Sequence, residues 1–383
     1  MLSASSTRRF NLLQLCAIGL WCATIGCQPA AGPMSPPTGS SPAVTTGEPG
    51  PSPTNVKRLI LMTNGNSPFW DACRVGMQAA EQELNLASVG LTTVLEVNDA
   101  TAQGQIDKLR QYASQSDIAG VAITVTDSEN VAIAEELKKL EAKGVHVVIM
   151  DSDFKGELKK QRKYFVGTNN EQCGAELGKA ASALRPDGGE YATFFGLASA
   201  QNVKERCAGF AKGAGDKLQS KDAMEDGMDR SRARDNVRNA IQNHPKLNTL
   251  VGIWSYNAPA IVDIVTELGR RKDFTIVVTD AEPIAIKNME DGQIDAMVVQ
   301  NPYRIGFESV RLLKALINRE DATLKEMYPN YGQPDGDLFD TGLKIVVPDS
   351  NTTIKKELFQ PSTELLKLSE FKDWLKKYSL EGS

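Results

Sequence analysis

Histidine is nearly absent from this sequence, which contains only His146 and His244. Neither has a partner at the spacing of a metal-binding pair or a catalytic triad, which argues against a zinc site and against histidine-based nucleophilic catalysis. Cysteine is also sparse. The three cysteines beyond residue 55, Cys73, Cys173 and Cys207, are widely spaced and odd in number, which fits neither a disulfide framework nor a metal site. We expect them to be small buried residues on helix faces, and we expect no metal ion or cofactor.

Positive charge is not in excess. Lysine and arginine together number 43, against 48 aspartates and glutamates, and the formal net charge is −5. No basic run is long enough to neutralise a row of phosphates, so we expect no nucleic-acid partner. The apolar run at residues 12–25 is shorter than a membrane-spanning helix requires.

The first 27 residues have the pattern of a targeting segment. Arg8 and Arg9 form a basic start, the apolar run follows, and a small residue directly precedes Cys27. This resembles a bacterial lipobox, in which the cysteine is acylated and becomes the new N-terminus, although Thr24 stands where leucine is usual. The alternative is an ordinary signal peptide cleaved nearby. We predict a lipid on Cys27 and an exported protein, periplasmic or at the cell surface, anchored to a membrane.

Residues 28–55 form a segment of low complexity. Eight of the 28 are proline, and most of the others are glycine, serine, threonine or alanine. Such a segment has too little apolar surface to offset the entropy of ordering it. We therefore predict a disordered linker between the lipid and a folded part that begins near Val56.

The folded part alternates between strand-like and helix-like patterns, and the series occurs twice. The first series consists of the strand-like runs 57–63, 93–98, 120–126 and 145–151. The second consists of 164–167, 190–195, 249–254, 275–279 and 296–300. A further strand is expected in the second series at 223–230, although the sequence there supports a strand poorly. A helix at 302–317, a last short strand at 343–347 and an amphipathic terminal helix at 364–378 follow. Two such βαβ series predict an α/β protein with two doubly wound, Rossmann-like lobes.

Several of these strands end in a polar residue. Asp151, Asp280 and Gln300 each close an apolar run, and Asn257 follows another. The carboxyl ends of strands in a doubly wound sheet face the crevice in which ligands bind. A carboxylate there can accept protons from adjacent sugar hydroxyls, although for each aspartate alone a helix N-cap is the commoner role.

Two further features point to the same crevice. The strand-to-helix loop after 57–63 carries Asn66 and Ser67, and then Phe69 and Trp70 open a helix; aromatic rings can stack on the C–H face of a sugar or staple the helix into the core. Arg206 lies early in a helix, where its charge opposes the helix dipole. An arginine at this position is explained if its guanidinium N–H groups donate hydrogen bonds to a ligand; the alternative is a surface ion pair.

These motifs resemble the type I, ribose/galactose-type periplasmic sugar-binding proteins in order and spacing. The resemblance covers about residues 56–347 and depends on five short stretches: 66–70, 148–151, 206–210, 278–280 and Gln300. It implies two lobes joined by three chain crossings, near 168–169, 300–301 and 340–342, with a small-molecule sugar or polyol bound between them. The N-terminal lobe would comprise 56–168 plus 301–340, and the C-terminal lobe 169–300 plus 341–383.

The resemblance also implies site residues and partners. The ligand would be bound by Asn66, Ser67, Phe69, Trp70, Asp151, Arg206, Asn257, Asp280 and Gln300. None of these residues would be catalytic. The protein, as a monomer, would deliver the ligand to the permease of an ABC transporter. Ribose binders have arginine where this sequence has Ser152, which we expect to leave room beside Asp151 for a sugar larger than ribose.

Two other functions use the same residues. Asp151 and Asp280 could be the carboxylate pair of a glycoside hydrolase, and the protein could be a ligand sensor for a membrane signalling partner.

Overall fold

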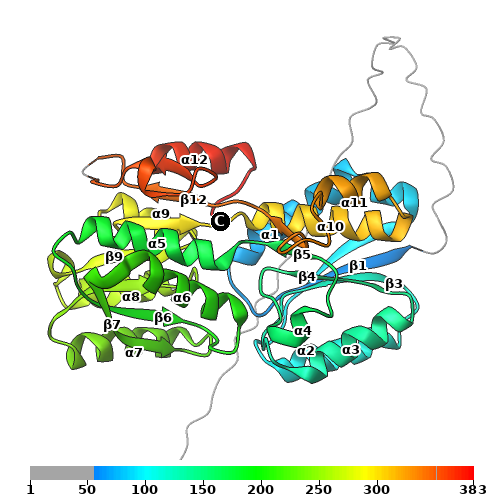
Figure 1. Ribbon diagram of the computed structural model, residues 1–383, viewed down its shortest axis with the longest axis horizontal. Helices are drawn as coiled ribbons and strands as arrows, with labels where there is room; N and C mark the ends of the chain where they lie inside the picture. Colours follow the sequence, from blue (N-terminus) through cyan, green and yellow to red (C-terminus); the bar gives the residue numbers. More distant parts are fainter. Residues whose placement is uncertain (1–55, 351) are drawn as a thin grey trace, which may run out of the picture. The chain divides into compact units, whose positions relative to one another are not determined.

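The computed structural model describes residues 56–350 and 352–383. The predicted signal segment with Cys27 and the linker at 28–55 lie outside the described residues. Within the described ranges, no helix combines the length and the apolar character needed to cross a membrane. The described residues form two β-sheets with helices on both faces of each (Figure 1), which confirms the predicted α/β class.

The first sheet is parallel throughout, with the order β11-β5-β4-β3-β1-β2. Its strands are β1 (Lys57–Met62), β2 (Leu91–Glu96), β3 (Ile118–Ile123), β4 (His146–Met150), β5 (Phe165–Gly167) and β11 (Leu338–Asp340). All six residues of β3 are buried, because helices cover both faces of the sheet. This explains why the strand reads as a continuous apolar run rather than an alternating one.

The second sheet has the order β13-β12-β10-β9-β8-β6-β7. Its strands are β6 (Gly189–Phe195), β7 (Leu218–Glu225), β8 (Leu247–Gly252), β9 (Thr275–Thr279), β10 (Ala296–Val299), β12 (Lys344–Val347) and β13 (Glu364–Lys367). The pairing of β10 with β12 is antiparallel, and the other pairings are parallel.

Helices bury apolar stripes on each sheet. The α-helices are α1 (Phe69–Glu83), α2 (Ala102–Ala113), α3 (Val131–Ala142), α4 (Gly156–Lys159), α5 (Asn170–Leu184), α6 (Gln201–Ala214), α7 (Arg230–Asn243), α8 (Asn257–Glu267), α9 (Pro283–Glu290), α10 (Pro302–Asn318), α11 (Asp321–Met327) and α12 (Leu368–Lys377). Helices α1 and α10 share one apolar cluster of the first sheet, and α2 and α3 share the other. Helices α5 and α6 contribute to one cluster of the second sheet, whereas α9 and α12 contribute to the other.

The chain passes between the two sheets three times. It leaves the first sheet after β5, returns after β10 into α10, whose Ser309 contacts Met150 of β4, and leaves again between β11 and β12. These passages place the carboxyl ends of strands from both sheets within reach of one another. The lobe boundaries 56–168 plus 301–340 and 169–300 plus 341–383 stay a prediction.

Two sequence predictions about elements are wrong. The weak strand position at 223–230 is occupied by a strand that begins earlier, at Leu218, and whose middle is polar and exposed because β7 is the edge of its sheet. The terminal helix begins at Leu368 rather than at 364, because Glu364–Lys367 forms β13 beside β12. The strand at 343–347 is therefore not the last.

Candidate ligand-binding site

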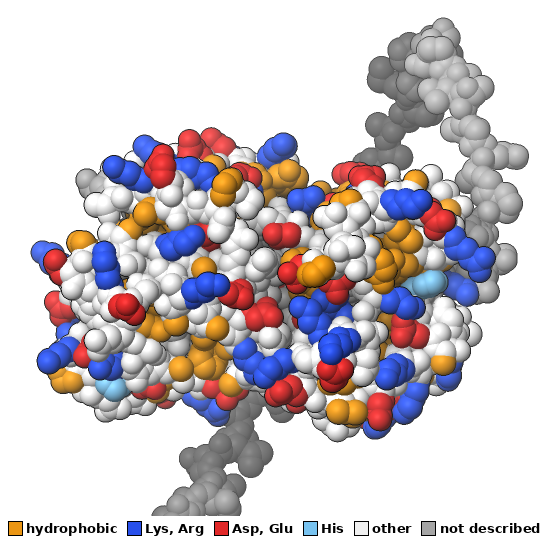
Figure 2. Space-filling view, viewed as in Figure 1, with side chains coloured by type: hydrophobic (Ala, Val, Ile, Leu, Met, Phe, Trp, Pro, Cys, Tyr) orange, Lys and Arg blue, Asp and Glu red, His pale blue; other side chains and the backbone are white. Residues whose placement is uncertain are grey.

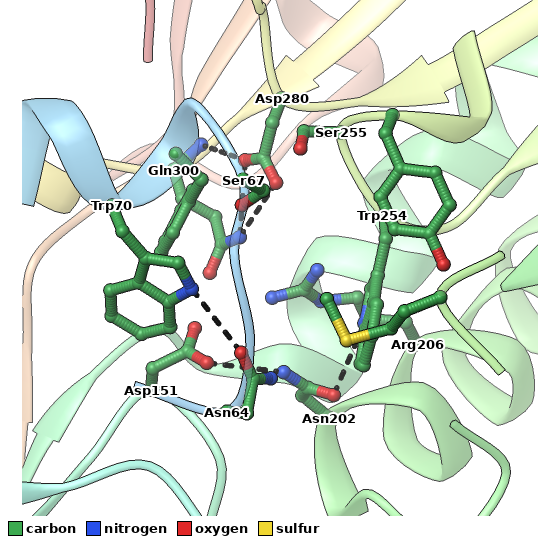
Figure 3. Close-up of a pocket in the computed structure, with 13 residues that line it drawn as sticks. Asn64, Ser67, Trp70, Asp151, Asn202, Arg206, Trp254, Ser255, Asp280 and Gln300 are labelled. Carbon is green, nitrogen blue, oxygen red and sulfur yellow. Dashed lines mark hydrogen bonds between the residues drawn. The ribbon is translucent and has the colours of Figure 1, made fainter. Parts of the chain in front are cut away.

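A cavity of about 340 Å³, including its mouth, lies among the carboxyl ends of strands from the two sheets. Figure 3 shows the lining side chains converging on this space from both halves of the folded part. The lining residues are Asn64, Ser67, Phe69, Trp70, Asp151, Asn202, Arg206, Met228, Trp254, Ser255, Tyr256, Asp280 and Gln300.

Asp151 and Asp280 occupy equivalent positions in the two sheets. Each directly follows its strand, β4 or β9, and each has a left-handed backbone, with φ of 59° and 66°. The N–H of Asp151 donates to Val166 O at 3.0 Å, and that of Asp280 donates to Val298 O at 2.8 Å. This backbone conformation is uncommon for residues other than glycine, although aspartate and asparagine adopt it more often than most, and it is often found at functional sites. Neither aspartate caps a helix, since the N-cap of α9 is Glu282.

The two carboxylates are 3% and 2% exposed, and the hydrogen bonds that they accept come from amides. Asn202 Nδ2 lies 3.4 Å from Asp151 Oδ2, and Gln300 Nε2 lies 3.0 Å from Asp280 Oδ1 (Figure 3). Burial raises the pKa of Asp151 to about 7 and that of Asp280 to about 6, with Arg206 opposing both shifts. Each carboxylate therefore retains acceptor capacity that a ligand hydroxyl can use.

Arg206 presents one unused donor group to the site. Its Nε donates to Asn170 Oδ1 at 2.9 Å and its Nη1 donates to Ile253 O at 3.1 Å. The Nη2 group has no hydrogen-bond partner among the described residues, and the whole side chain is 1% exposed. The alternative of a surface ion pair is wrong, because the Arg206 side chain is buried and its bonded donors face Asn170 and Ile253.

Aromatic rings line the cavity from both halves. Phe69 and Trp70 meet edge to face, with ring centroids 5.0 Å apart, and both also belong to the apolar cluster under α1. Trp254 and Tyr256 pack edge to face on the other side, at 6.4 Å. Phe69 and Trp70 thus pack into the core and also line the cavity, while stacking on a sugar stays a prediction.

Three residues are placed differently from the sequence expectation. Asn66 is exposed and does not line the cavity; its neighbour Asn64 does, where it accepts from Trp70 Nε1. Asn257 is fully buried outside the cavity, because its amide is bonded to the Trp254 N–H and to Asp226. We therefore withdraw a direct ligand contact for Asn66 and Asn257.

Ser152 is also completely buried and is not a lining residue. The expectation that its small side chain leaves room beside Asp151 for a sugar larger than ribose stays a prediction.

Sequence reasoning missed six lining residues: Asn64, Asn202, Met228, Trp254, Ser255 and Tyr256. Two of them carried a signal, because Trp254 and Tyr256 flank the end of an apolar strand run. Tyr256 is held in place by its hydroxyl, which donates to the buried Asp226 after β7. Burial raises the pKa of Asp226 to about 6, against the lowering effect of this hydrogen bond.

The two halves touch beside the cavity. The N–H and Oγ of Ser128, before α3, donate to Ser199 O, before α6, at 3.1 and 2.9 Å. Lys204 Nζ reaches Ser128 Oγ at 2.8 Å. Met228 lies against Gly65, where a Cβ atom would come within 2.5 Å of its Cε. The structure is therefore in a closed conformation, with the cavity between touching halves.

A pair of Rossmann-like sheets joined by three chain passages, with a polar cavity at the strand ends between them, defines a two-lobed solute-binding protein. Residues 59–321, well over half of the chain, match the family model described as periplasmic binding protein domain, and the chain belongs to this family. The resemblance inferred from the short motifs is thereby confirmed at the level of the family.

Similar proteins carry sugar-related names. The chain is 28% identical over 267 residues to the D-allose-binding periplasmic protein of Escherichia coli K12, covering 67% of this chain and 82% of the relative. It is 26% identical over 243 residues to a ribose import binding protein of Bacillus subtilis 168, covering 63% and 75%. A solved solute-binding protein of Burkholderia graminis, in complex with D-arabinose, has the same fold, with a TM-score of 0.68, 24% identity and coverage of 79% and 99%.

Proposed function

We propose that this protein captures a monosaccharide or a related polyol between its two lobes and delivers it to an ABC importer. The names of its allose- and ribose-binding relatives support a sugar as the ligand, and the family supports export from the cytoplasm. Lipid attachment at Cys27, a monomeric state and a permease partner are finer parts of the same proposal.

The observation that carries the proposal is the set of unused polar groups around an aromatic-walled cavity. Arg206 Nη2 and Gln300 Oε1 are buried without partners among the described residues, and a buried unpaired polar group is costly. A sugar hydroxyl can accept from the first and donate to the second. Asp151 and Asp280 add charged acceptors from opposite lobes, while Trp70 offers a ring for the C–H face.

Charge supports a neutral ligand rather than an anion. The cavity lining contains two aspartates and one arginine. Acidic and basic side chains are interspersed over the face of the molecule in Figure 2, with no broad field of positive charge to attract a phosphate or a nucleic acid.

The direct test is a thermal-shift screen of the purified protein against aldohexoses, pentoses, polyols and nucleosides, followed by calorimetry of any hit. A ligand at a hundredfold over its Kd adds about 2.7 kcal/mol of stability, which the screen detects. Stabilisation by none of the sugars or polyols, with a clear response to another class, would overturn the proposal.

Two competing functions have separate readouts. A glycoside hydrolase built on Asp151 and Asp280 would release product from aryl glycosides, whereas a receptor binds at equilibrium without turnover. A sensor would be encoded beside a histidine kinase, whereas an importer subunit would be encoded beside a permease and an ATPase.

A further inference from the structure

The segment Leu380–Ser383 contacts one residue of the proposed site, Gln300, and the residue that follows another, Asp280. Ser383 is 2% exposed and forms a two-way bridge with Ala281: its N–H donates to Ala281 O at 2.9 Å, and its O accepts from the Ala281 N–H at 2.6 Å. The Ser383 hydroxyl also donates to Gln300 O at 2.9 Å. Ala281 follows Asp280, so the segment contacts the backbone next to one ligand-facing side chain and the backbone of another. Figure 1 marks this end of the chain between the two halves.

A turn at the end of α12 directs the chain to this position. At the end of α12, the N–H of Leu380 donates to Leu375 O and that of Ser379 donates to Lys376 O, with Ser379 in the left-handed region at φ 54°. This is a Schellman motif, which turns the chain sharply away from the helix. Leu380 then enters the apolar cluster of α9 and α12, which fixes the start of the segment.

The other sheet provides a comparison. Asp151 and Asp280 have the same left-handed conformation, and each donates its N–H to the neighbouring strand. After Asp151, the carbonyl of Ser152 accepts from the N–H of Val125, in the loop that follows β3. After Asp280, the carbonyl of Ala281 accepts instead from Ser383. The 380–383 segment thus supplies in one lobe the backbone hydrogen bond that the loop after β3 supplies in the other.

We propose that the 380–383 segment is a positioning element of the ligand site, which holds Asp280 and Gln300 in the geometry that binding requires. This inference rests on the proposed function, because it assumes that these two side chains contact the ligand. The family match ends at residue 321, so the segment lies outside the matched region. It acts through Asp280 and Gln300, and it does not line the cavity itself.

Gly382 allows a sharp test. A Cβ atom there would lie 2.7 Å from Ala281 O and 2.8 Å from Pro283 Cδ, so Gly382→Leu should expel the segment from its place. Glu381→Leu is the matched control, because the same side chain is added one residue earlier at an exposed position. Ser383→Ala removes only the hydroxyl, and Ser383→Thr restores it.

Each full-length variant is examined by hydrogen exchange without ligand and by calorimetry with D-allose as the probe. In Gly382→Leu we expect amide exchange at Ala281 to accelerate at least ~10-fold and D-allose affinity to fall at least ~5-fold at a temperature where every variant is folded. Ser383→Ala should weaken binding by about 3-fold, with Ser383→Thr close to wild type.

The two measurements separate this inference from the proposed function. Failure of D-allose to bind the wild type counts against this sugar as the ligand, and exchange at Ala281 still decides whether the segment holds this backbone. The inference is overturned if amide exchange at Ala281 in Gly382→Leu is unchanged. It is also overturned if this exchange is faster but Gly382→Leu binds D-allose as tightly as Glu381→Leu does. A lower melting temperature with unchanged affinity would show a merely structural role and would also overturn it.

Discussion

Replacement of Asp280 by asparagine separates the charge of this carboxylate from its role in the backbone. Alanine would be a poor choice, because residue 280 has φ of 66° and asparagine tolerates this region better. An asparagine Oδ1 can still accept from the Gln300 N–H and from Gln300 Nε2, as the aspartate Oδ1 does. The variant should therefore fold, with the negative charge as the main change.

The charge should affect stability with a definite sign. Burial raises the pKa of Asp280 from 3.8 to about 6, so the folded state binds this proton more tightly than the unfolded state does. Above pH 6 the ionised carboxylate then costs about 3 kcal/mol of unfolding free energy, and this cost declines as the pH falls from 6 toward 3.8. Without ligand, Asp280→Asn should be more stable than wild type at pH 8, by less than ~3 kcal/mol because opening of the lobes relieves part of the cost, and the gain should be smaller at pH 5.

Ligand binding should change in the opposite direction. Loss of a charge-assisted hydrogen bond costs about 1.5–3 kcal/mol, which corresponds to about 10- to 150-fold weaker binding. Urea unfolding at pH 5 and pH 8, together with calorimetry against the best sugar from the screen, measures both effects. Asp335→Asn is the matched control, since Asp335 is exposed and has φ of 55°. Full affinity in Asp280→Asn would remove this carboxylate from the site, and lower stability at pH 8 would refute the argument from buried charge.

Three further expectations concern anchoring, recognition and motion. Cys27→Ser should release the protein from the membrane fraction, and an unchanged distribution would contradict the lipid anchor. Arg206→Ala should weaken sugar binding at least ~10-fold and Trp70→Ala should weaken it through lost stacking, as measured by calorimetry of the folded variants; wild-type affinity in either would remove that residue from the site. Small-angle scattering should show a smaller radius of gyration with saturating sugar than without it, because hinge closure buries the ligand, whereas an equal radius despite proven binding would indicate a rigid pocket.

The sequence predicted the central strands well, because these strands are buried on both faces. β9 (Thr275–Thr279) is fully buried, and its apolar run gave its limits correctly. β7 failed for the opposite reason: it lies at the edge of its sheet, its residues Gln219 to Lys221 are exposed, and no apolar run marks it. β13 was missed because four residues before an amphipathic helix continue its pattern, and only the pairing with β12 makes them a strand.

The site was predictable where a side chain follows its strand directly. Asp151, Asp280 and Gln300 line the cavity because the end of a parallel strand fixes where the next residue lies. The prediction for Asn257 failed because this residue lies five positions past the end of β8, at the start of α8, where its side chain accepts from the Trp254 N–H and donates to Asp226. Asp226 follows β7, an edge strand whose predicted start was five residues too late. Nothing in the sequence therefore pointed to its hydrogen bond with Tyr256.

We expect proton binding, as well as ligand binding, to couple the two lobes. Asp151 and Asp280 belong to different sheets, and in the closed conformation burial raises the pKa of the first to about 7 and that of the second to about 6. Opening exposes both carboxylates to water and removes the cause of these shifts, so the closed form binds protons more tightly than the open form.

Without ligand, a lower pH should therefore favour closure, because the protonated carboxylates are buried at little cost. We expect the radius of gyration of the ligand-free protein to decrease between pH 8 and pH 5, and the double variant Asp151→Asn with Asp280→Asn to be compact at both values. With sugar bound, its hydroxyls and Arg206 stabilise the ionised carboxylates, so the pH dependence of the radius should diminish. A ligand-free radius that stays constant or increases on acidification would refute this coupling, since the sign follows from the raised pKa values alone.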